Sequence, residues 1–239
     1  MRVKICGLIF LAFSLSFFNS FAQTVQPDSM LYSSAATQVI DYFNRVTAIQ
    51  SEIYNGAEYE LYPPANKGSF YFMDKNYCTP SVICCSGAWY KNIPVLYDIY
   101  NDAMVATSDS GLYVLREEKV SDVYLLNHHF IHVNAESPGS LISGFYDQLY
   151  SGKSQVLVKR IKLIDESKST ETVYEDKSDL YIKKGNKYYL VNTRGALMDI
   201  FKDKKKLLNQ YMAEHKIKYN KDKEAAAAKL ASYYDQISN

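Results

Sequence analysis

The sequence predicts an α+β fold: an antiparallel β meander, flat or curved into a half-barrel, with an N-terminal helix and two to three C-terminal helices. Two observations predict this order. After Pro63-Pro64, short runs of Val, Ile, Tyr and Phe are broken by turn signals about every 8 to 12 residues. Before this part and after Thr193, apolar residues recur at three- and four-residue steps. Parallel βαβ units would need helices between the strands, so the order favours an antiparallel sheet.

The composition is typical of a soluble globular domain, because 47% of the 239 residues are hydrophobic and 22% are charged. This balance excludes a disordered chain, a collagen and a coiled coil. The 27 basic and 26 acidic residues nearly cancel, so the basic excess of nucleic-acid-binding proteins is missing. We therefore expect no nucleic-acid partner.

The first 22 residues have the pattern of a cleavable secretory signal peptide. Arg2 and Lys4 form a positive start, Ile5 to Phe18 is almost wholly apolar, and Ser20-Phe21-Ala22 supplies small residues for cleavage. The apolar run of about 14 residues is short for a bilayer span, which needs about 20. We expect export to the periplasm or the cell exterior, a single domain over residues 23–239, and no membrane span.

A first amphipathic helix is predicted from Ser29 to Ile53. Asn55-Gly56 follows it as a stop signal, because a positive φ costs little there. The apolar stripe is narrow, so the helix is expected to cover part of the sheet. Its apolar residues are Ala35, Val39, Ile40, Phe43, Val46, Ile49 and Ile53.

The strands of the meander are predicted from runs of β-branched and aromatic residues. Asn101-Asp102, Ser151-Gly152 and Gly185-Asn186 separate such runs at the spacing of tight hairpins. Asp165 to Thr172 is polar and aperiodic, which predicts an exposed loop. The predicted strands are Ser69–Met73, Val82–Cys85, Val95–Tyr100, Ala103–Thr107, Leu112–Arg116, Val123–Leu126, Phe130–Val133, Gly144–Tyr150, Gln155–Ile164, Asp179–Lys183 and Lys187–Val191.

Beyond Thr193 the helical period returns. Asp222 is the expected N-cap of the last helix. The apolar positions of the three runs are Ala196, Leu197, Ile200 and Phe201, then Leu207, Leu208, Tyr211 and Met212, then Ala226, Leu230, Tyr233, Tyr234 and Ile237.

The stretch from Lys202 to Lys223 contains eight lysines against three acidic residues. We interpret it as the solvated side of packed helices. The alternative is a surface that faces an anionic lipid or polysaccharide.

Three cysteines follow the predicted signal peptide, so at most one internal disulfide can form. A bond between the neighbours Cys84 and Cys85 would be strained. We expect Cys78 to pair with Cys84 or Cys85 across a turn at Thr79-Pro80. A redox Cys-x-x-Cys motif and the paired Cys/His spacings of a zinc site are both missing from the sequence, which predicts no cofactor.

The best metal candidates are His128, His129 and His132, and their spacing argues against a site. On a strand, His128 and His132 share a face about 13 Å apart, and His129 points away from both. Catalytic motifs are also missing: Gly139 to Gly144 lacks the Gly-x-Ser-x-Gly order, and Gly152-Lys153-Ser154 has the pattern of a hairpin turn. The sequence therefore predicts no metal site and no catalytic residue.

The sequence contains 22 tyrosines and one tryptophan, Trp89. Tyrosine suits half-buried strand positions and also recognition surfaces. We expect mainly sheet packing and place a candidate ligand or partner surface at Trp89, Tyr97, Asp98 and Tyr100. Asp98 is included as an acid inside an apolar strand.

The segments that carry a resemblance are Tyr54-Asn55-Gly56-x-Glu58-Tyr59, Pro94 to Ile99, Gly144 to Gly152, and the lysine-rich C-terminal helices ending at Tyr233-Tyr234. They resemble small uncharacterised exported proteins of Gram-negative bacteria. The resemblance implies an envelope location and a common fold, and it implies no activity. The architecture also resembles the half-barrels of periplasmic lipoprotein carriers, although their sequence motifs are missing.

The sequence thus favours a non-catalytic binding or structural module of the envelope that recognises a protein or a glycan. The first alternative is a periplasmic carrier of a lipid or another apolar ligand. The second is an enzyme with no recognisable motif.

Overall fold

The computed structural model describes residues 52–62, 67–134, 141–165 and 173–238. These residues belong to one compact unit, Asp41–Asn239. The signal peptide predicted for residues 1–22, nearly all of the helix predicted from Ser29 to Ile53, and all but the first residue of the loop predicted from Asp165 to Thr172 lie outside these ranges. The single domain predicted for residues 23–239 stays a prediction.

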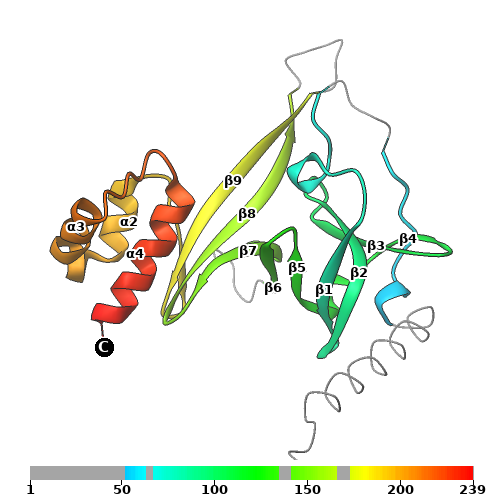
Figure 1. Ribbon diagram of the computed structural model, residues 1–239, viewed down its shortest axis with the longest axis horizontal. Helices are drawn as coiled ribbons and strands as arrows, with labels where there is room; N and C mark the ends of the chain where they lie inside the picture. The colour runs from blue at the N-terminus through cyan, green and yellow to red at the C-terminus, as the bar shows by residue number, and fades with distance from the viewer. Residues whose placement is uncertain (1–51, 63–66, 135–140, 166–172, 239) are drawn as a thin grey trace, which may run out of the picture. The chain divides into compact units, whose positions relative to one another are not determined.

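The described residues form a ten-stranded antiparallel sheet, shown with its helices in Figure 1. The longest hairpin joins β8 and β9, whose register runs from Ser154 opposite Lys184 to Ile164 opposite Tyr174. The strands are β1 (Thr79–Cys85), β2 (Ala88–Asp98), β3 (Ala103–Ser108), β4 (Gly111–Val114), β5 (Val120–Leu125), β6 (His128–Val133), β7 (Gly144–Ser151), β8 (Ser154–Ile164), β9 (Tyr174–Lys184) and β10 (Lys187–Leu190).

The strand order is β10-β9-β8-β7-β6-β5-β1-β2-β3-β4. Two meanders, β1 to β4 and β5 to β10, are therefore joined by an antiparallel pair of β1 and β5. The chain returns from β4 through the 3-10 turn Glu117–Lys119 (η4), and Ser86 N donates to the Lys119 carbonyl at 2.8 Å. The predicted antiparallel α+β meander is confirmed, with this one departure from chain order.

The strands predicted from Val82 onward all overlap observed strands, but the one predicted at Ser69–Met73 is wrong. Tyr71 forms a single bridge to Asp98, and the chain then makes a 3-10 turn at Phe72–Asp74 (η3). The Asp74 carboxylate accepts hydrogen bonds from the backbone N–H of Ser69 at 2.9 Å and from its hydroxyl at 3.2 Å, which favours a turn over an extended strand.

The three predicted hairpins are confirmed, with a shift of one residue in the second turn. Asn101-Asp102 ends the four-residue connection between β2 and β3, and Gly185-Asn186 connects β9 to β10. The connection between β7 and β8 is Gly152-Lys153, one residue later than predicted, because Ser151 is the last residue of β7. Asp102 and Gly185 have φ values of 57° and 60°, the left-handed conformation that Asp and Gly tolerate in such turns.

The C-terminal helices are α2 (Arg194–Ile200), α3 (Lys205–Glu214) and α4 (Lys223–Ile237), with a 3-10 turn at Lys202–Lys204 (η5). Thr193 Oγ1 accepts from the N–H of Ala196 at 3.1 Å, and Asp222 Oδ1 accepts from that of Ala225 at 2.9 Å. These side chains cap α2 and α4, as predicted for Asp222.

The helices share a core with the long strands of the sheet. Val156, Val158, Leu180 and Ile182 of β8 and β9 pack in one cluster with helical residues that are fully buried. Each fully buried large side chain contributes roughly 2 kcal/mol to this packing. The fully buried residues that the helices contribute are Leu197, Leu208, Ala227, Leu230 and Ala231, joined by Phe201 directly after α2.

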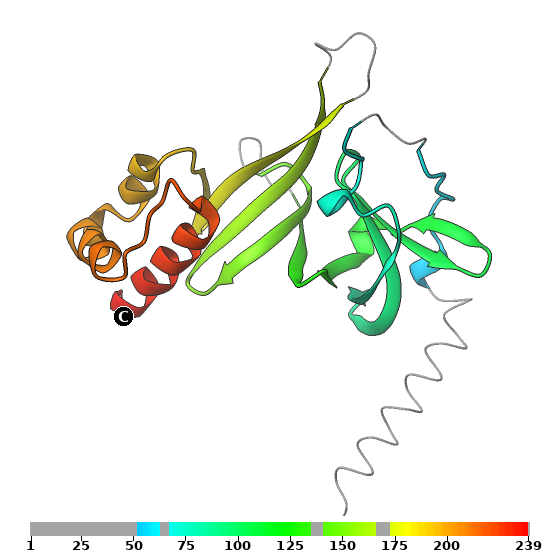
Figure 2. The same ribbon diagram turned by 45° about the horizontal axis from the view of Figure 1, so that its top comes forward.

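Helix α4 lies beside β7 and β8 (Figure 2), and side-chain hydrogen bonds join it to these strands near both of its ends. Near its C-terminus, the buried Asp235 carboxylate accepts from the backbone N–H of Ser154 at 2.8 Å, the Ser154 hydroxyl at 2.9 Å and the Tyr150 hydroxyl at 3.1 Å. Near its N-terminus, Glu224 accepts two hydrogen bonds from Arg160 at 2.6 and 2.8 Å. These hydrogen bonds link α4 to β7 and β8.

None of the helices in the described ranges combines the length and the apolarity that crossing a bilayer requires.

Candidate functional site

The residues predicted for a ligand or partner surface do not form one surface. Trp89 is 49% exposed and Tyr100 is 42% exposed, whereas Tyr97 and Asp98 are buried. Trp89 and Tyr97 lie eight residues apart on β2, a separation of about 26 Å along an extended strand. Of these four residues only Trp89, near the start of β2, and Tyr100, in the turn after β2, are available to a partner.

The buried Asp98 carboxylate is fully engaged in hydrogen bonds within the protein. Its carboxylate accepts hydrogen bonds from the Tyr59 hydroxyl and the Asn101 amide, both at 2.8 Å, and from the backbone N–H groups of Tyr100 and Asn101, both at 3.0 Å. Burial, together with the hydrogen bond to Asp98, raises the pKa of the Tyr59 hydroxyl. Asp98 therefore stabilises the turn between β2 and β3.

Many tyrosines pack against other rings along the sheet. The rings of Tyr62 and Phe70 stack with centroids 4.0 Å apart, and Tyr174 lies 4.3 Å from Phe70. Tyr100 contacts Phe70 edge-on at 5.2 Å. Tyr100 is thus the exposed edge of an aromatic cluster that holds the segment before β1 against the sheet.

The three described cysteines are free thiols, and the expected bridge from Cys78 is not formed. The expectation depended on a turn at Thr79-Pro80, and that turn is wrong because both residues belong to β1. Six extended residues place Cys78 and Cys84 about 20 Å apart, whereas a disulfide needs Cα atoms about 4.4 to 6.8 Å apart.

The three clustered histidines contact three different carboxylates. His128 Nδ1 lies 2.7 Å from Asp147, His129 Nε2 lies 2.8 Å from Asp122, and His132 Nε2 lies 3.8 Å from Glu117. Within the described ranges, no three His, Cys, Asp or Glu side chains come together as a potential metal site.

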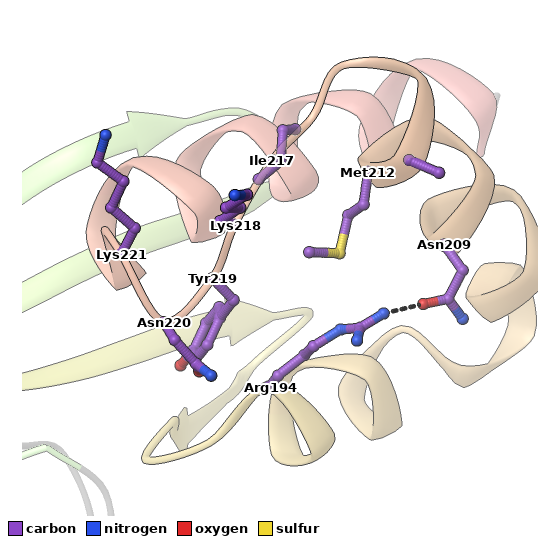
Figure 3. Close-up of a pocket in the computed structure, with 9 residues that line it drawn as sticks. Arg194, Asn209, Met212, Ile217, Lys218, Tyr219, Asn220 and Lys221 are labelled. Atoms are coloured by element: carbon purple, nitrogen blue, oxygen red, sulfur yellow. Dashed lines mark hydrogen bonds between the residues drawn. The ribbon is translucent and has the colours of Figure 1, made fainter.

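A pocket that the sequence analysis did not single out lies among the C-terminal helices (Figure 3). Its volume is about 610 Å³, within the range of small-molecule sites. The walls come from the start of α2, one face of α3 and the loop that joins α3 to α4. The lining residues are Arg194, Asn209, Met212, Ala213, Ile217, Lys218, Tyr219, Asn220 and Lys221.

The sequence builds the loop wall of this pocket through a specific helix ending. After α3, the N–H of Lys216 donates to the Ala213 carbonyl at 3.2 Å, and the N–H of Ile217 donates to the Met212 carbonyl at 2.9 Å. This is a Schellman motif, with Lys216 at φ 52° where glycine is usual. The motif places Ile217 beside Met212, and both side chains line the pocket.

Tyr219 fixes the rest of the loop. Its side chain is only 3% exposed and belongs to the core cluster of the helices. Burial raises the pKa of its hydroxyl. Because Tyr219 is anchored in the core, Lys218, Asn220 and Lys221 are held at the rim of the pocket.

The lining of the pocket is cationic. Arg194, Lys218 and Lys221 contribute positive charge, and no acidic residue lines the pocket. An Arg194 Nη2 atom donates to Asn209 Oδ1 at 2.7 Å (Figure 3). No carboxylate in the described part of the chain forms an ion pair with these three cations.

The charge around the pocket differs from that of the rest of the chain. From Arg194 to the C-terminus there are ten basic residues against six acidic ones, whereas the preceding residues contain 17 basic and 20 acidic ones. The nearly neutral total therefore conceals a basic C-terminal part. Such a local excess attracts anions more strongly than the net charge indicates.

A second pocket of about 580 Å³ adjoins the first, and Asn209 lines both. Four lysines, Lys202, Lys204, Lys205 and Lys206, line it together with Asp203, Leu207 and Asn209. The Asp203 carboxylate accepts from Lys184 and from the Tyr234 hydroxyl, both at 3.0 Å. Burial raises the pKa of Asp203, but the hydrogen bonds from Lys184 and Tyr234, a backbone hydrogen bond and the charge of Lys184 together lower it below its ordinary value. This acid is therefore already neutralised by its own partners.

The lysine-rich stretch was the available sequence signal for this site. From the helical spacing of its apolar residues alone, we interpreted this stretch as the solvated side of packed helices. Arg194 and Asn209 lie outside any recognisable motif, and only the packing of α2 against α3 brings them together.

No family model matches the chain, and neither a curated protein nor a solved structure matches it.

Proposed function

We propose that this protein is an exported binding module that holds an anionic ligand in the pocket of Arg194, Lys218 and Lys221. The observation that carries the proposal is the lining itself: three cations and no acid around a pocket of about 610 Å³. The export part depends on the signal-peptide pattern of residues 1–22.

Arg194 is the central recognition residue of the proposal. A guanidinium donates in a planar fork that matches the oxygens of a carboxylate or a phosphate. The hydrogen bond to Asn209 orients the Arg194 side chain before a ligand arrives, which reduces the entropy lost on binding. Lys218 and Lys221 add charge without fixing a geometry.

The apolar residues of the pocket narrow the class of ligand. Met212, Ala213 and Ile217 line it beside the cations. An anionic group that carries an apolar part would satisfy both kinds of wall. This observation favours the carrier alternative as the second candidate function, in which the same pocket holds an amphiphilic anion such as a lipid phosphate.

Calorimetric titration with decyl phosphate, inorganic phosphate and decanol tests the proposal. We expect decyl phosphate to bind more tightly than either of the others. Arg194→Gln should weaken binding by at least tenfold, because a hydrogen bond to a charged group contributes about 1.5 to 3 kcal/mol. Lys229→Ala is the matched control, because Lys229 is exposed on α4 and lines neither pocket.

Two results would contradict the proposal. The first is no heat of binding with decyl phosphate at about 1 mM, the weak end of specific affinities. The second is an equal loss of affinity in K229A and R194Q, because that would indicate only a diffuse attraction to the basic surface.

Export is tested separately, by the intact mass of the protein recovered from the envelope or medium of its own cells. We expect a mature chain that begins at Gln23. A chain that retains Met1 would refute export by this signal.

A further inference from the structure

Three rings lie on one face of the sheet formed by β2, β1, β5 and β6. Trp89 and Tyr124 are 49% and 46% exposed. Ile83 and Val123, at alternating positions on β1 and β5, are fully buried in the core on the other face. Trp89 and Tyr124 therefore stand on the outer face, and we refer to them with His129 as the aromatic platform.

The strand register places the platform residues side by side. Trp89 lies opposite Cys84 of β1, and Cys84 lies opposite Asp122 of β5. Two residues after Asp122 on β5, Tyr124 lies opposite Val82 of β1 on one side and opposite His129 of β6 on the other. The platform therefore extends across four adjacent strands.

Neighbouring side chains contact and orient the rings. Tyr124 and His129 stack with centroids 4.2 Å apart and an interplanar angle of 5°. Trp89 lies 6.1 Å from Tyr124 at an angle of 36°. His129 Nε2 is 2.8 Å from the Asp122 carboxylate, which orients the imidazole. The surface is thus formed before any ligand binds, which lowers the entropic cost of binding.

The size of the platform argues for a small ligand. A whole aromatic side chain covers about 150 to 250 Å², so two half-exposed rings offer on the order of 200 Å². A stable protein interface buries about 800 Å² on each partner. Two or three sugar rings fit the platform better than a protein does.

The charges beside the rings argue for an uncharged ligand. Asp122 lies in one cross-strand row with Trp89, and Lys91 lies in the next row with Tyr124. One acid and one base balance each other. A nucleic acid would instead require several cations to neutralise its phosphates.

From these observations we propose that the aromatic platform binds a neutral oligosaccharide. The apolar C–H face of a pyranose would stack on Trp89 and Tyr124, because the faces of aromatic rings carry partial negative charge. The Asp122 carboxylate has lone pairs left for a sugar hydroxyl, and the Lys91 ammonium can donate to another. This inference does not depend on the anionic pocket of the helices.

The single tryptophan gives a direct measurement. We expect the Trp89 fluorescence of the full protein to shift on titration with at least one of chitohexaose, cellohexaose and maltohexaose. By calorimetry, Trp89→Ala and Tyr124→Ala should each weaken that binding by about 3- to 10-fold, from about 0.5 to 1.5 kcal/mol per stacked ring. Tyr124→Phe should retain it, because the ring is kept.

Tyr100→Ala is the matched control, since Tyr100 is an exposed tyrosine outside the platform. We expect this variant to bind the sugar like the wild type. The inference is overturned if none of the three hexasaccharides binds at about 10 mM, weaker than the usual range of specific binding, or if Y100A weakens binding as much as Y124A. It is also overturned if a dT12 oligonucleotide binds in a W89A-sensitive way, which would assign the platform to nucleic acid. R194Q should leave sugar binding unchanged, so the two proposed sites fail or succeed separately.

Discussion

Replacing Asp147 by Asn tests how much the fold depends on one buried carboxylate. Asp147 lies on β7 with a side chain only 1% exposed, and His128 Nδ1 lies 2.7 Å from it. Arg160 donates to the same carboxylate from Nε at 3.1 Å and also from Nη2. Asparagine keeps the size of the side chain but removes the charge that balances Arg160.

The magnitude follows from what remains around Arg160. Removing one partner of a buried ion pair costs about 3 to 5 kcal/mol, because the other charge stays buried. Arg160 keeps its two hydrogen bonds to Glu224 at 2.6 and 2.8 Å. We therefore expect the lower end, about 3 kcal/mol of unfolding free energy. For a chain of this size the melting temperature should fall by about 6 to 12 °C.

Urea denaturation followed by circular dichroism measures this effect. Glu224→Gln is the comparison, with an expected loss of about 1 kcal/mol, because Glu224 is 31% exposed and water can replace part of the contact. Since both acids contact Arg160, the double variant should deviate from additivity by at least about 0.5 kcal/mol. A loss below about 0.5 kcal/mol in D147N, the usual effect of a surface change, would refute this reasoning, as would strict additivity.

Three further predictions concern other parts of the chain. Burial raises the pKa of Asp74, but the hydrogen bond and charge of Lys162 and the two hydrogen bonds from Ser69 together lower it below its ordinary value of 3.8. The stabilisation from the ionised Asp74 is therefore fully present above pH 3.8 and is lost as the pH falls through the lower pKa of the folded state. Urea denaturation at acidic pH should show a smaller loss of stability in Asp74→Asn than in the wild type. Leu230→Ala, at a fully buried position of α4, should lose about 2 to 5 kcal/mol in the same assay, and a loss under about 1 kcal/mol would contradict the packing. Burial raises the thiol pKa of both Cys78 and Cys85, but Cys85 is only 2% exposed. Iodoacetamide should therefore modify Cys78 of the native protein first, as measured by peptide mapping. Modification of both thiols at the same rate would contradict the burial of Cys85 on β1.

The elements that the sequence predicted correctly are those decided by neighbouring residues. Gly185-Asn186 specifies a two-residue turn because glycine reaches a φ of 60° without strain. Asp222 caps α4 because its carboxylate reaches the N–H of a residue three positions later. The alternation and the helical period of the apolar residues likewise depend on local geometry, so they predicted most strands and the three helices.

The wrong predictions were those in which specific contacts overrode the local composition. Ser69–Met73 has a strand-like composition, but Asp74 turns it and only Tyr71 finds a bridge partner. The pairing of β1 with β5 left no local signal, because hydrophobic burial in the shared core selects it. The extension of β1 to Thr79 removed the turn on which the expected disulfide depended.

The candidate sites also combine features that the sequence indicated with features that only tertiary contacts produce. From the sequence alone, the tyrosine surplus and the lysine-rich stretch pointed to aromatic and solvated basic surfaces, and Trp89, named there as a candidate ligand or partner residue, is exposed. Its partners Tyr124 and His129 could be found only once β1 had paired with both β2 and β5. Arg194 and Asn209 meet only because α2 packs on α3. Side chains far apart in the sequence converge through the register of strands and the packing of helices, and these depend on the free energy of the whole core and not on any local pattern.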